Sequence, residues 1–207
     1  MKTIFVAGIG TDVGKTVVAA VLTEALKADY WKPVQTGSFF GTDTENVKKW
    51  VTNEKTFFHP EAYCLEQYMS PHAAAEWEKI SIKLENIQIP KTSNHLVIEG
   101  AGGIMVPLNN KEFVIDIAKK ANAEVILVIQ NYLGSINHSL LSIDVLKQRG
   151  HKIMGFILNG PRNASSEKVI LAYSGLKCLG SIGKEKEIKK EIVSKYALDF
   201  ENILNEK

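Results

Sequence analysis

The chain has 207 residues, of which 45% are hydrophobic and 23% are charged, and its formal net charge is +2. This length and composition are typical of one globular domain with a single core, spanning residues 1–207. The small net charge argues against a nucleic-acid partner or an acidic membrane surface, and no apolar run is long enough to cross a bilayer. Cys64 and Cys178 lie far apart, and the first predicted strand leaves no room for a leader peptide. We therefore expect a cytoplasmic protein without disulfides or a zinc site.

Short apolar runs predict strands that are buried on both faces, and the amphipathic runs between them predict helices. In chain order the predicted elements are a strand at 2–7, a helix at 15–28, a short strand at 30–34, a helix at 42–51, a helix at 73–79, a strand at 95–98, a helix at 113–121, a strand at 124–130, a helix at 135–149, a strand at 152–158, a strand at 176–182 and a charged helix at 185–195. Residues 37–41 and 53–72 are expected to be irregular. Strands that alternate with helices indicate an α/β fold, with a mainly parallel sheet covered by helices on both faces.

The first predicted strand leads into Gly8-Ile9-Gly10-Thr11-Asp12-Val13-Gly14-Lys15-Thr16, and a predicted helix follows at once. This order is typical of a phosphate-binding loop, in which backbone amides and the positive end of the helix dipole face an anion. Lys15 would then reach the β- and γ-phosphates of ATP, and Thr16 would bind Mg²⁺. Ile9 stands where the usual spacing has a glycine, so the alternative is a chance glycine turn with a surface lysine.

Polar side chains follow the ends of the other predicted strands. They are Lys32, Gln35, Thr36 and Gly37 after the second strand, Glu99 after the third, Asn131, Gly134 and Ser135 after the fourth, and Asn159 after the fifth. Each alone is typical of a solvated loop. Together they are expected at one edge of the sheet, because ligands of parallel sheets bind at the carboxyl ends of the strands.

Two carboxylates are candidate ligands for the Mg²⁺ of ATP, which takes one or two carboxylates beside phosphate and water oxygens. Glu99 directly follows a buried strand, and Asp43 opens a helix after a glycine-rich loop. With Thr16 they make a candidate metal site, although Asp43 is equally suited to cap its helix. Lys32, held beside Pro33, is a candidate to stabilise a transferring phosphoryl group or an anionic co-substrate, and the alternative is a surface lysine.

Five motifs in the right order resemble the ATP-dependent dethiobiotin synthetase family. They are the loop at 8–16, Lys-Pro-Val-Gln-Thr-Gly at 32–37, Ser-Pro-His-Ala-Ala at 70–74, Val-Ile-Glu-Gly-Ala-Gly-Gly at 97–103 with Pro107-Leu108, and Leu-Gly-Ser-Ile-Asn-His at 133–138. The resemblance runs from residue 2 to about residue 160 and accounts for the spacing between Gly8 and Gly14. It implies a P-loop NTPase-like fold and a cyclo-ligase that uses Mg²⁺, ATP, CO2 or bicarbonate, and 7,8-diaminononanoate. A carbamate forms, takes the γ-phosphate of ATP, and is closed to the ureido ring of dethiobiotin by the second amine.

The resemblance also implies residue roles. The implied catalytic residues are Lys15, Lys32 and Thr11. The implied ATP-binding residues are Asp12, Val13, Gly14, Lys15, Thr16, Val17, Glu99, Gly100, Ala101, Gly102 and Asn159. The implied substrate-binding residues are Thr36, Gly134, Ser135, Ile136 and Asn137, and the implied metal ligands are Thr16, Asp43 and Glu99. A homodimer is implied as well, because in the family the second subunit holds the tail carboxylate of the substrate.

The chain departs from the family near the expected adenine site. Asn159 is followed by Gly160-Pro161 where the family often has arginine, and the segment at 177–183 lacks the usual prolines. We therefore expect weaker discrimination between ATP and other nucleoside triphosphates. Separately, Tyr132 replaces a more usual lysine, which affects one expected contact to the substrate.

Two other functions fit the same loop, namely a partitioning or septum-positioning ATPase and a small-molecule kinase. The ATPases carry an extra lysine early in the phosphate loop, and none occurs between Gly8 and Val13. They also often end in an amphipathic membrane-binding helix, for which residues 185–195 are too highly charged.

Overall fold

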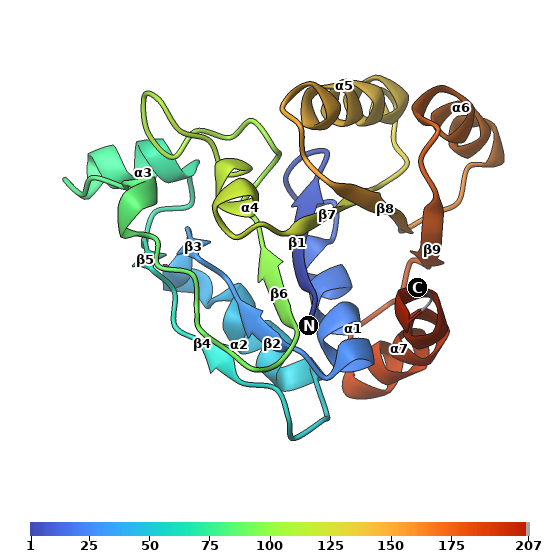
Figure 1. Ribbon diagram of the computed structural model, residues 1–207, viewed down its shortest axis with the longest axis horizontal. Coiled ribbons are helices and arrows are strands. Elements are labelled where there is room, and N and C mark those ends of the chain that lie inside the picture. Colours follow the sequence, from blue (N-terminus) through green and yellow to red (C-terminus); the bar gives the residue numbers. More distant parts are fainter. Residues whose placement is uncertain (206–207) are drawn as a thin grey trace.

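The computed structural model describes residues 1–205 and contains one parallel sheet of seven strands in the order β4-β2-β6-β1-β7-β8-β9 (Figure 1). Its strands are β1 (Thr3–Gly8), β2 (Asp29–Trp31), β4 (Phe58–His59), β6 (Leu96–Glu99), β7 (Glu124–Ile129), β8 (Ile153–Asn159) and β9 (Cys178–Ile182). The predicted α/β fold with a mainly parallel sheet is confirmed.

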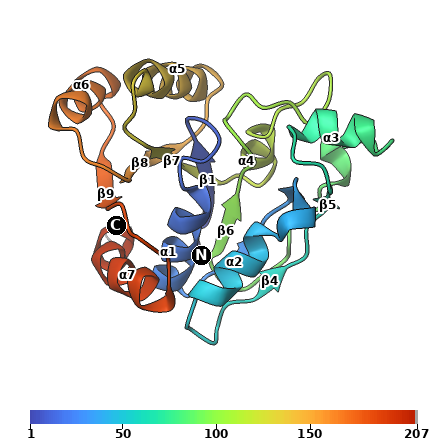
Figure 2. The same ribbon diagram turned by 180° about the vertical axis from the view of Figure 1, so that it is seen from behind.

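Helices connect the strands and cover the sheet on both sides. They are α1 (Lys15–Leu26), α2 (Asp43–Trp50), α3 (Pro71–Trp77), α4 (Asp116–Lys120), α5 (Ser135–Gln148), α6 (Ala164–Ser174) and α7 (Lys190–Asn205), with short 3-10 turns at Ser38–Phe40 and Leu84–Asn86. Helices α1, α2 and α7 contact one another, and α5 contacts α6. The two groups lie on opposite sides of the sheet (Figures 1 and 2).

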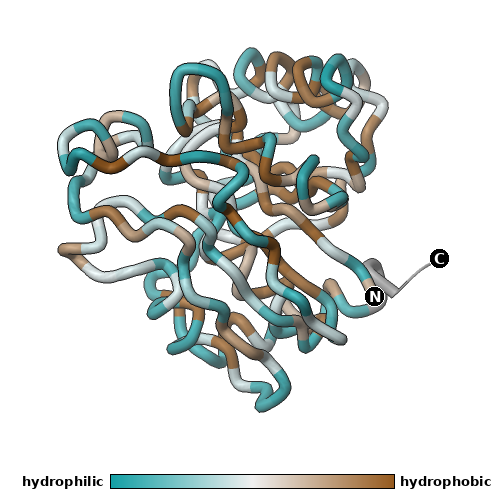
Figure 3. Tube along the Cα trace, turned by 60° about the vertical axis from the view of Figure 1, so that its left-hand side comes forward, coloured by the Kyte–Doolittle hydropathy of each residue, from teal (hydrophilic) through white to brown (hydrophobic). Residues whose placement is uncertain are grey.

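The middle of the sheet is the hydrophobic core of the molecule. β1 lies between β6 and β7, and nearly every residue of these three strands is buried. Hydropathy colouring shows the same arrangement, with hydrophobic segments running through the interior and hydrophilic ones in the outer loops (Figure 3). Because β1 pairs in register with β6, with Val6 opposite Glu99, the phosphate loop and Glu99 emerge at the same edge.

The prediction of one strand over residues 30–34 is wrong, because the chain changes sheets there. β2 ends at Trp31, and Val34–Gln35 forms a separate strand, β3, which pairs with β5 (Tyr63–Cys64) in a second, two-stranded sheet. Pro33 has no N–H group to donate to a strand ladder and restricts the residue before it, so the strand is interrupted at this point. The strands β4 and β5 lie within the segment at 53–72 that was expected to be irregular.

The C-terminal third also differs from the sequence prediction. Helix α6 was not predicted; it is capped by Asn163, whose side chain accepts a hydrogen bond from the Ser166 amide at 3.0 Å. The final helix was predicted at 185–195 but runs from Lys190 to Asn205. Its buried side chains Val193, Ala197 and Phe200 give it an apolar face, and the helix packs against α1 and β9. No helix among residues 1–205 combines the length and the apolar character needed to cross a membrane.

We expect Phe200→Ala to destabilise the protein by about 3–5 kcal/mol, the usual loss for a buried phenylalanine. The ring is 1% exposed and lies so close to Gly180 that a Cβ there would sit 2.7 Å from Phe200 Cζ. Urea unfolding followed by circular dichroism measures the loss. Leu198→Ala is the matched control on the same helix, since Leu198 is 69% exposed, and it should change the free energy of unfolding by less than about 1 kcal/mol. Equal losses in the two variants would contradict the packing of α7.

Candidate active site

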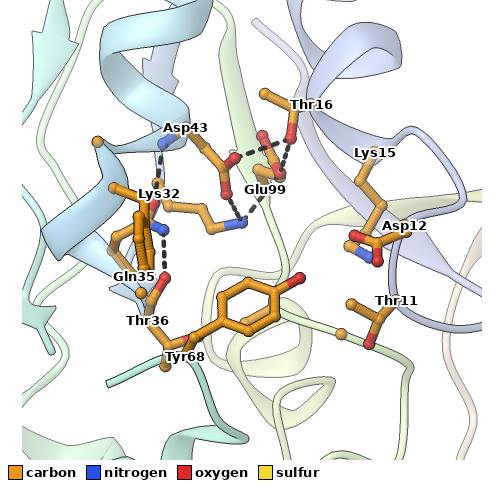
Figure 4. A pocket seen from close by; sticks show the side chains of 15 residues that line it. Thr11, Asp12, Lys15, Thr16, Lys32, Gln35, Thr36, Asp43, Tyr68 and Glu99 are labelled. Carbon is orange, nitrogen blue, oxygen red and sulfur yellow. Dashed lines mark hydrogen bonds and ion pairs between the residues drawn. The ribbon is translucent and has the colours of Figure 1, made fainter. Parts of the chain in front are cut away.

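A cavity of about 400 Å³ opens at the carboxyl edge of the sheet, beside the phosphate loop (Figure 4). We call it the reaction cavity; it is lined by Thr11, Asp12, Lys15, Thr16, Lys32, Gln35, Thr36, Gly37, Phe40, Gly41, Asp43, Tyr68, Glu99, Ala101 and Gly102. The structure thus brings together predicted residues that are up to 91 positions apart in the chain, from Thr11 to Gly102. The polar residues predicted after β2 and β6 converge with the phosphate loop in this cavity, whereas those predicted after β7 and β8, namely Asn131, Gly134, Ser135 and Asn159, do not line it.

A buried lysine between two carboxylates is at the centre of the cavity. Lys32 Nζ lies 2.7 Å from Asp43 Oδ2 and 2.9 Å from Glu99 Oε1, and it also donates to the Gly100 carbonyl at 3.1 Å. Burial alone would lower the pKa of Lys32, but the Glu99 and Asp43 carboxylates raise it above its ordinary value. Lys32 is 3% exposed, so the alternative of a surface lysine is wrong.

The three predicted metal ligands meet at one point. Thr16 Oγ1 lies 2.9 Å from Glu99 Oε1 and 3.1 Å from Asp43 Oδ1. Since a hydroxyl has a single proton, Thr16 can donate to only one of these oxygens at a time. No group of three or more His, Cys, Asp or Glu side chains suited to a metal occurs in the part of the chain that the structure describes. Two carboxylates and a hydroxyl nevertheless fit Mg²⁺, whose remaining ligands come from substrate phosphates and water.

The Asp43 carboxylate can contact the residues of the cavity because Thr42, and not Asp43, caps helix α2. Thr42 accepts from the Glu45 amide at 3.1 Å, and Glu45 Oε2 accepts from the Thr42 amide at 3.0 Å, which is a capping box. Asp43 is the first residue of the helix, and its amide donates to Gln35 Oε1 at 2.9 Å. The alternative of Asp43 as the helix cap is therefore wrong. Burial would raise the pKa of Asp43, but the Lys32 ammonium holds it below its usual range.

Lys15 belongs to the phosphate loop and faces the same cavity. Its Nζ donates to the Gly10 carbonyl at 2.9 Å. Burial, with help from the nearby Lys32 ammonium, lowers the pKa of Lys15 to about 8. An anion bound in the loop would supply the negative charge that Lys15 lacks, and would raise this pKa.

Two tyrosines near the cavity were not singled out from the sequence. Tyr30, fully buried on β2, donates from its hydroxyl to Glu99 Oε2 at 2.7 Å. Burial and the Glu99 charge raise the pKa of Tyr30 well above its ordinary value, so the hydroxyl stays a donor. Tyr68 extends its ring into the cavity between Thr36 and Thr11 (Figure 4). Neither tyrosine could be singled out from the sequence, because Tyr30 lies inside a strand, where an aromatic residue indicates core packing, and Tyr68 lies in a segment without periodicity.

The remaining predicted nucleotide residues lie along the phosphate loop and at the end of β8. Asn159 Nδ2 donates to the Val13 carbonyl at 3.0 Å. Gly14 adopts φ 89° directly beneath this amide, and a Cβ at Gly14 would sit 2.0 Å from Asn159 Nδ2. Only glycine therefore fits at this position. Val17, in the first turn of α1, is partly buried against the core, and neither it nor Val13 lines the reaction cavity.

The predicted substrate residues at 134–137 lie apart from the reaction cavity, at the start of α5. Between them and the phosphate loop is a second cavity of about 380 Å³, lined by Ile9, Gly10, Thr11, Gly103, Ile104, Met105, Val106, His138, Leu141, Ser142 and Val145. The Ser135 amide donates to the Tyr132 carbonyl at 3.0 Å, so it is not free for a ligand. Ser135 Oγ, in contrast, is buried and has no hydrogen-bond partner among the described residues. Of the predicted set, only Thr36 lines the reaction cavity.

Comparison with known proteins gives a consistent result. Residues 2–191 match the protein-family model described as an AAA domain. The chain is 49% identical to the ATP-dependent dethiobiotin synthetase BioD of Cytophaga hutchinsonii, over 98% of each chain. It is 48% identical to the protein of the same name from Christiangramia forsetii, over 99% of each chain.

Solved structures resemble the chain more distantly. The septum site-determining protein MinD of Pyrococcus horikoshii, complexed with Mg-ADP, has a TM-score of 0.62 and 17% identity over 99% of this chain and 97% of that one. The cell division ATPase MinD of Pyrococcus furiosus has a TM-score of 0.61 and 17% identity over 98% and 100%. At such identity the similarity shows the fold alone, which is the P-loop NTPase-like arrangement predicted from the sequence.

The lowered pKa of Lys15 predicts a pH dependence of ATP binding. Below pH 8 the Lys15 ammonium is mostly protonated and available to phosphate, and above this pH it loses its proton and its charge. For a pKa of about 8, the dissociation constant of ATP should rise about tenfold between about pH 7 and about pH 9. Isothermal titration at several pH values measures it. Lys15→Arg is the matched control, because it keeps its charge over this range; the same pH dependence in this variant would exclude Lys15 as the cause.

Proposed function

Because the chain belongs to the ATP-dependent dethiobiotin synthetase family, we propose that residues 1–207 act as one domain that converts 7,8-diaminononanoate, CO2 and ATP to dethiobiotin, ADP and phosphate. The observation that carries the proposal is the buried Lys32, which faces two carboxylates in a cavity that also contains Lys15. A cavity with two cationic side chains, a phosphate loop and no nucleophilic cysteine suits two anionic reactants that must approach each other. Since ATP is the co-substrate, we expect a cytoplasmic enzyme.

The chemistry needs positioning more than it needs a reactive side chain. An amine of the substrate adds to CO2, loses a proton and becomes a carbamate. A carbamate oxygen takes the γ-phosphoryl group of ATP, and ADP leaves. The second amine then attacks the carbamoyl carbon and loses a proton as the C–N bond forms, and phosphate leaves with the former carbamate oxygen. Because the substrate supplies both nucleophiles, the protein contributes orientation and charge stabilisation.

The side chains in the reaction cavity suit these steps. Lys15 would bind the β- and γ-phosphates, and Lys32 would stabilise the negative charge of the carbamate and of the transferring phosphoryl group. Thr11 and Thr36, on opposite sides of the Tyr68 ring, have hydroxyls suited to bind the carbamate or the diamine (Figure 4). The backbone amides of residues 12–17 would bind the phosphates. The segment Glu99–Gly102 closes the same edge, and the Asn159 side chain would contact the adenine.

Thr16, Asp43 and Glu99 would hold the Mg²⁺ of ATP, which supplies charge neutralisation of the phosphates when bound. In the structure Lys32 is the cation between the two carboxylates. The proposal therefore requires Lys32 to exchange one of these contacts for the carbamate.

We further propose a homodimer in which the start of α5 in one subunit receives the substrate tail of the other. The unpartnered Ser135 hydroxyl and the amides of Ile136 and Asn137 fit a carboxylate at a helix N-terminus. Leu133 and Leu141, which are 103% and 55% exposed, add an apolar surface on the same helix and its approach. Gly134 adopts φ 101° at the cap and has no side chain, so no Cβ stands beside the helix start.

The decisive experiment measures ADP release with Mg-ATP, bicarbonate and 7,8-diaminononanoate, omitting each component in turn, and records the product mass. We expect release to require all components and the product to carry one carbonyl group in place of two hydrogen atoms of the diamine. Slow hydrolysis that is indifferent to the diamine would instead support a nucleotide-switch ATPase. A stable phosphorylated product would support a small-molecule kinase.

Replacing Lys32 tests its place between the carboxylates. In metal-free buffer Lys32→Met should lose about 3–5 kcal/mol of stability, because Glu99 and Asp43 are left without their buried cation. Added Mg²⁺ should restore part of this loss, as followed by urea unfolding. Lys15→Met is the matched control, since Lys15 donates to the Gly10 carbonyl rather than to a carboxylate. An equal response of both variants to Mg²⁺ would argue against direct competition for the carboxylates.

A further inference from the structure

The two oxygens of Glu99 have separate sets of partners. Oε1 faces the cavity, where it accepts from Thr16 Oγ1 at 2.9 Å and from Lys32 Nζ at 2.9 Å. Oε2 points into the protein and accepts from the Tyr30 hydroxyl at 2.7 Å. The Glu99 side chain is 1% exposed, so water does not compete for either oxygen.

The packing of Tyr30 keeps its hydroxyl bonded to Glu99 Oε2 and so keeps the two oxygens of Glu99 in separate roles. The tyrosine is completely buried on β2, and β2 pairs with β6 so that Tyr30 lies opposite Val97. Its ring packs against Phe58 of β4, with the ring centroids 6.0 Å apart. The hydroxyl therefore reaches Glu99 from the neighbouring strand of the sheet, and Glu99 cannot turn Oε2 toward the cavity without losing a buried hydrogen bond.

The number of oxygens that a carboxylate offers matters for the choice of cation. Mg²⁺ requires near-octahedral ligands and takes carboxylates through single oxygens, whereas Ca²⁺ accepts six to eight ligands and readily takes both oxygens of one carboxylate. A hydrogen bond from a buried phenol to one oxygen of a glutamate favours metal ligation through the other oxygen alone. Residues that orient a ligand in this way commonly change metal affinity when they are mutated.

We propose that Tyr30 is a positioning residue that makes Glu99 a one-oxygen ligand and so favours Mg²⁺ over Ca²⁺ at the nucleotide site. The inference rests on the proposed metal site and adds a determinant of metal selectivity to it. Tyr30 touches neither reactants nor metal and acts only through Glu99.

The test compares Mg²⁺ and Ca²⁺ binding to wild-type enzyme and to Tyr30→Phe, by isothermal titration of the complex with a non-hydrolysable ATP analogue. Phenylalanine keeps the packing on Phe58 and removes only the hydroxyl. We expect Mg²⁺ affinity to fall about tenfold and Ca²⁺ affinity to fall less or to rise, so that the selectivity ratio drops at least about fivefold. A merely structural role would weaken both ions equally and leave the ratio unchanged, which would overturn the inference.

Tyr196→Phe is the matched control, because it removes another tyrosine hydroxyl that donates to a glutamate, Glu185, at 2.7 Å. Tyr196 is on α7 and does not line the reaction cavity, so its loss should leave both affinities unchanged. If Tyr196→Phe shifts the ratio as Tyr30→Phe does, the inference is wrong. A wild-type complex that binds no Mg²⁺ beyond the analogue alone would overturn the proposed metal site itself, and the inference with it.

Discussion

The pairing of Lys32 with Glu99 is the constraint on which the rest of the site depends. Both side chains are almost completely buried, and an unpaired charge in such a place is strongly unfavourable. The pair requires β2 and β6 to lie side by side with their ends aligned, and Thr16 adds the start of α1. Asp43, whose side chain is 28% exposed, completes the cluster from α2. The arrangement of four elements is thus fixed at one point by electrostatics as well as by the core.

The same constraint explains why the cavity suits phosphoryl chemistry. Lys32 and Lys15 have pKa values shifted in opposite directions, since Lys32 is paired with carboxylates and Lys15 is buried near another cation. Lys32 is therefore a permanent positive charge, and Lys15 becomes fully charged in the company of an anion. Within the site the charges of the two lysines and of Asp43 and Glu99 offset one another, and a bound phosphate would add a negative partner for Lys15.

Much of this could be predicted from the sequence because it depends on local patterns. Buried runs such as Phe5 to Ala7 and Val125 to Ile129 specify central strands, and the glycine turn before Lys15 specifies the phosphate loop. The errors come from features that only tertiary structure decides. Pro33 divides a strand between two sheets, and α7 depends on burial of Phe200 against β9 rather than on its charged first turn. Tyr30 reads as a core aromatic, and only the pairing of β2 with β6 brings its hydroxyl to Glu99.

The residues after Asn159, where the chain departs from the family, are held in place by a network of hydrogen bonds around Glu167. Glu167, 5% exposed, accepts from Arg162 at 2.6 Å, from the Asn163 amide at 2.9 Å and from Asn131 at 3.1 Å. Arg162 also donates to Ser181 on β9 at 3.1 Å. One carboxylate thus ties together the chain after β7, the chain after β8 and, through Arg162, strand β9. Because Asn159 lies between this network and the phosphate loop, the backbone around Gly160-Pro161 is well supported on both sides. With adenine bound here as proposed, a loss of base selectivity would come from missing contacts to the base and not from a loosened phosphate loop, which Asn159 supports through the Val13 carbonyl.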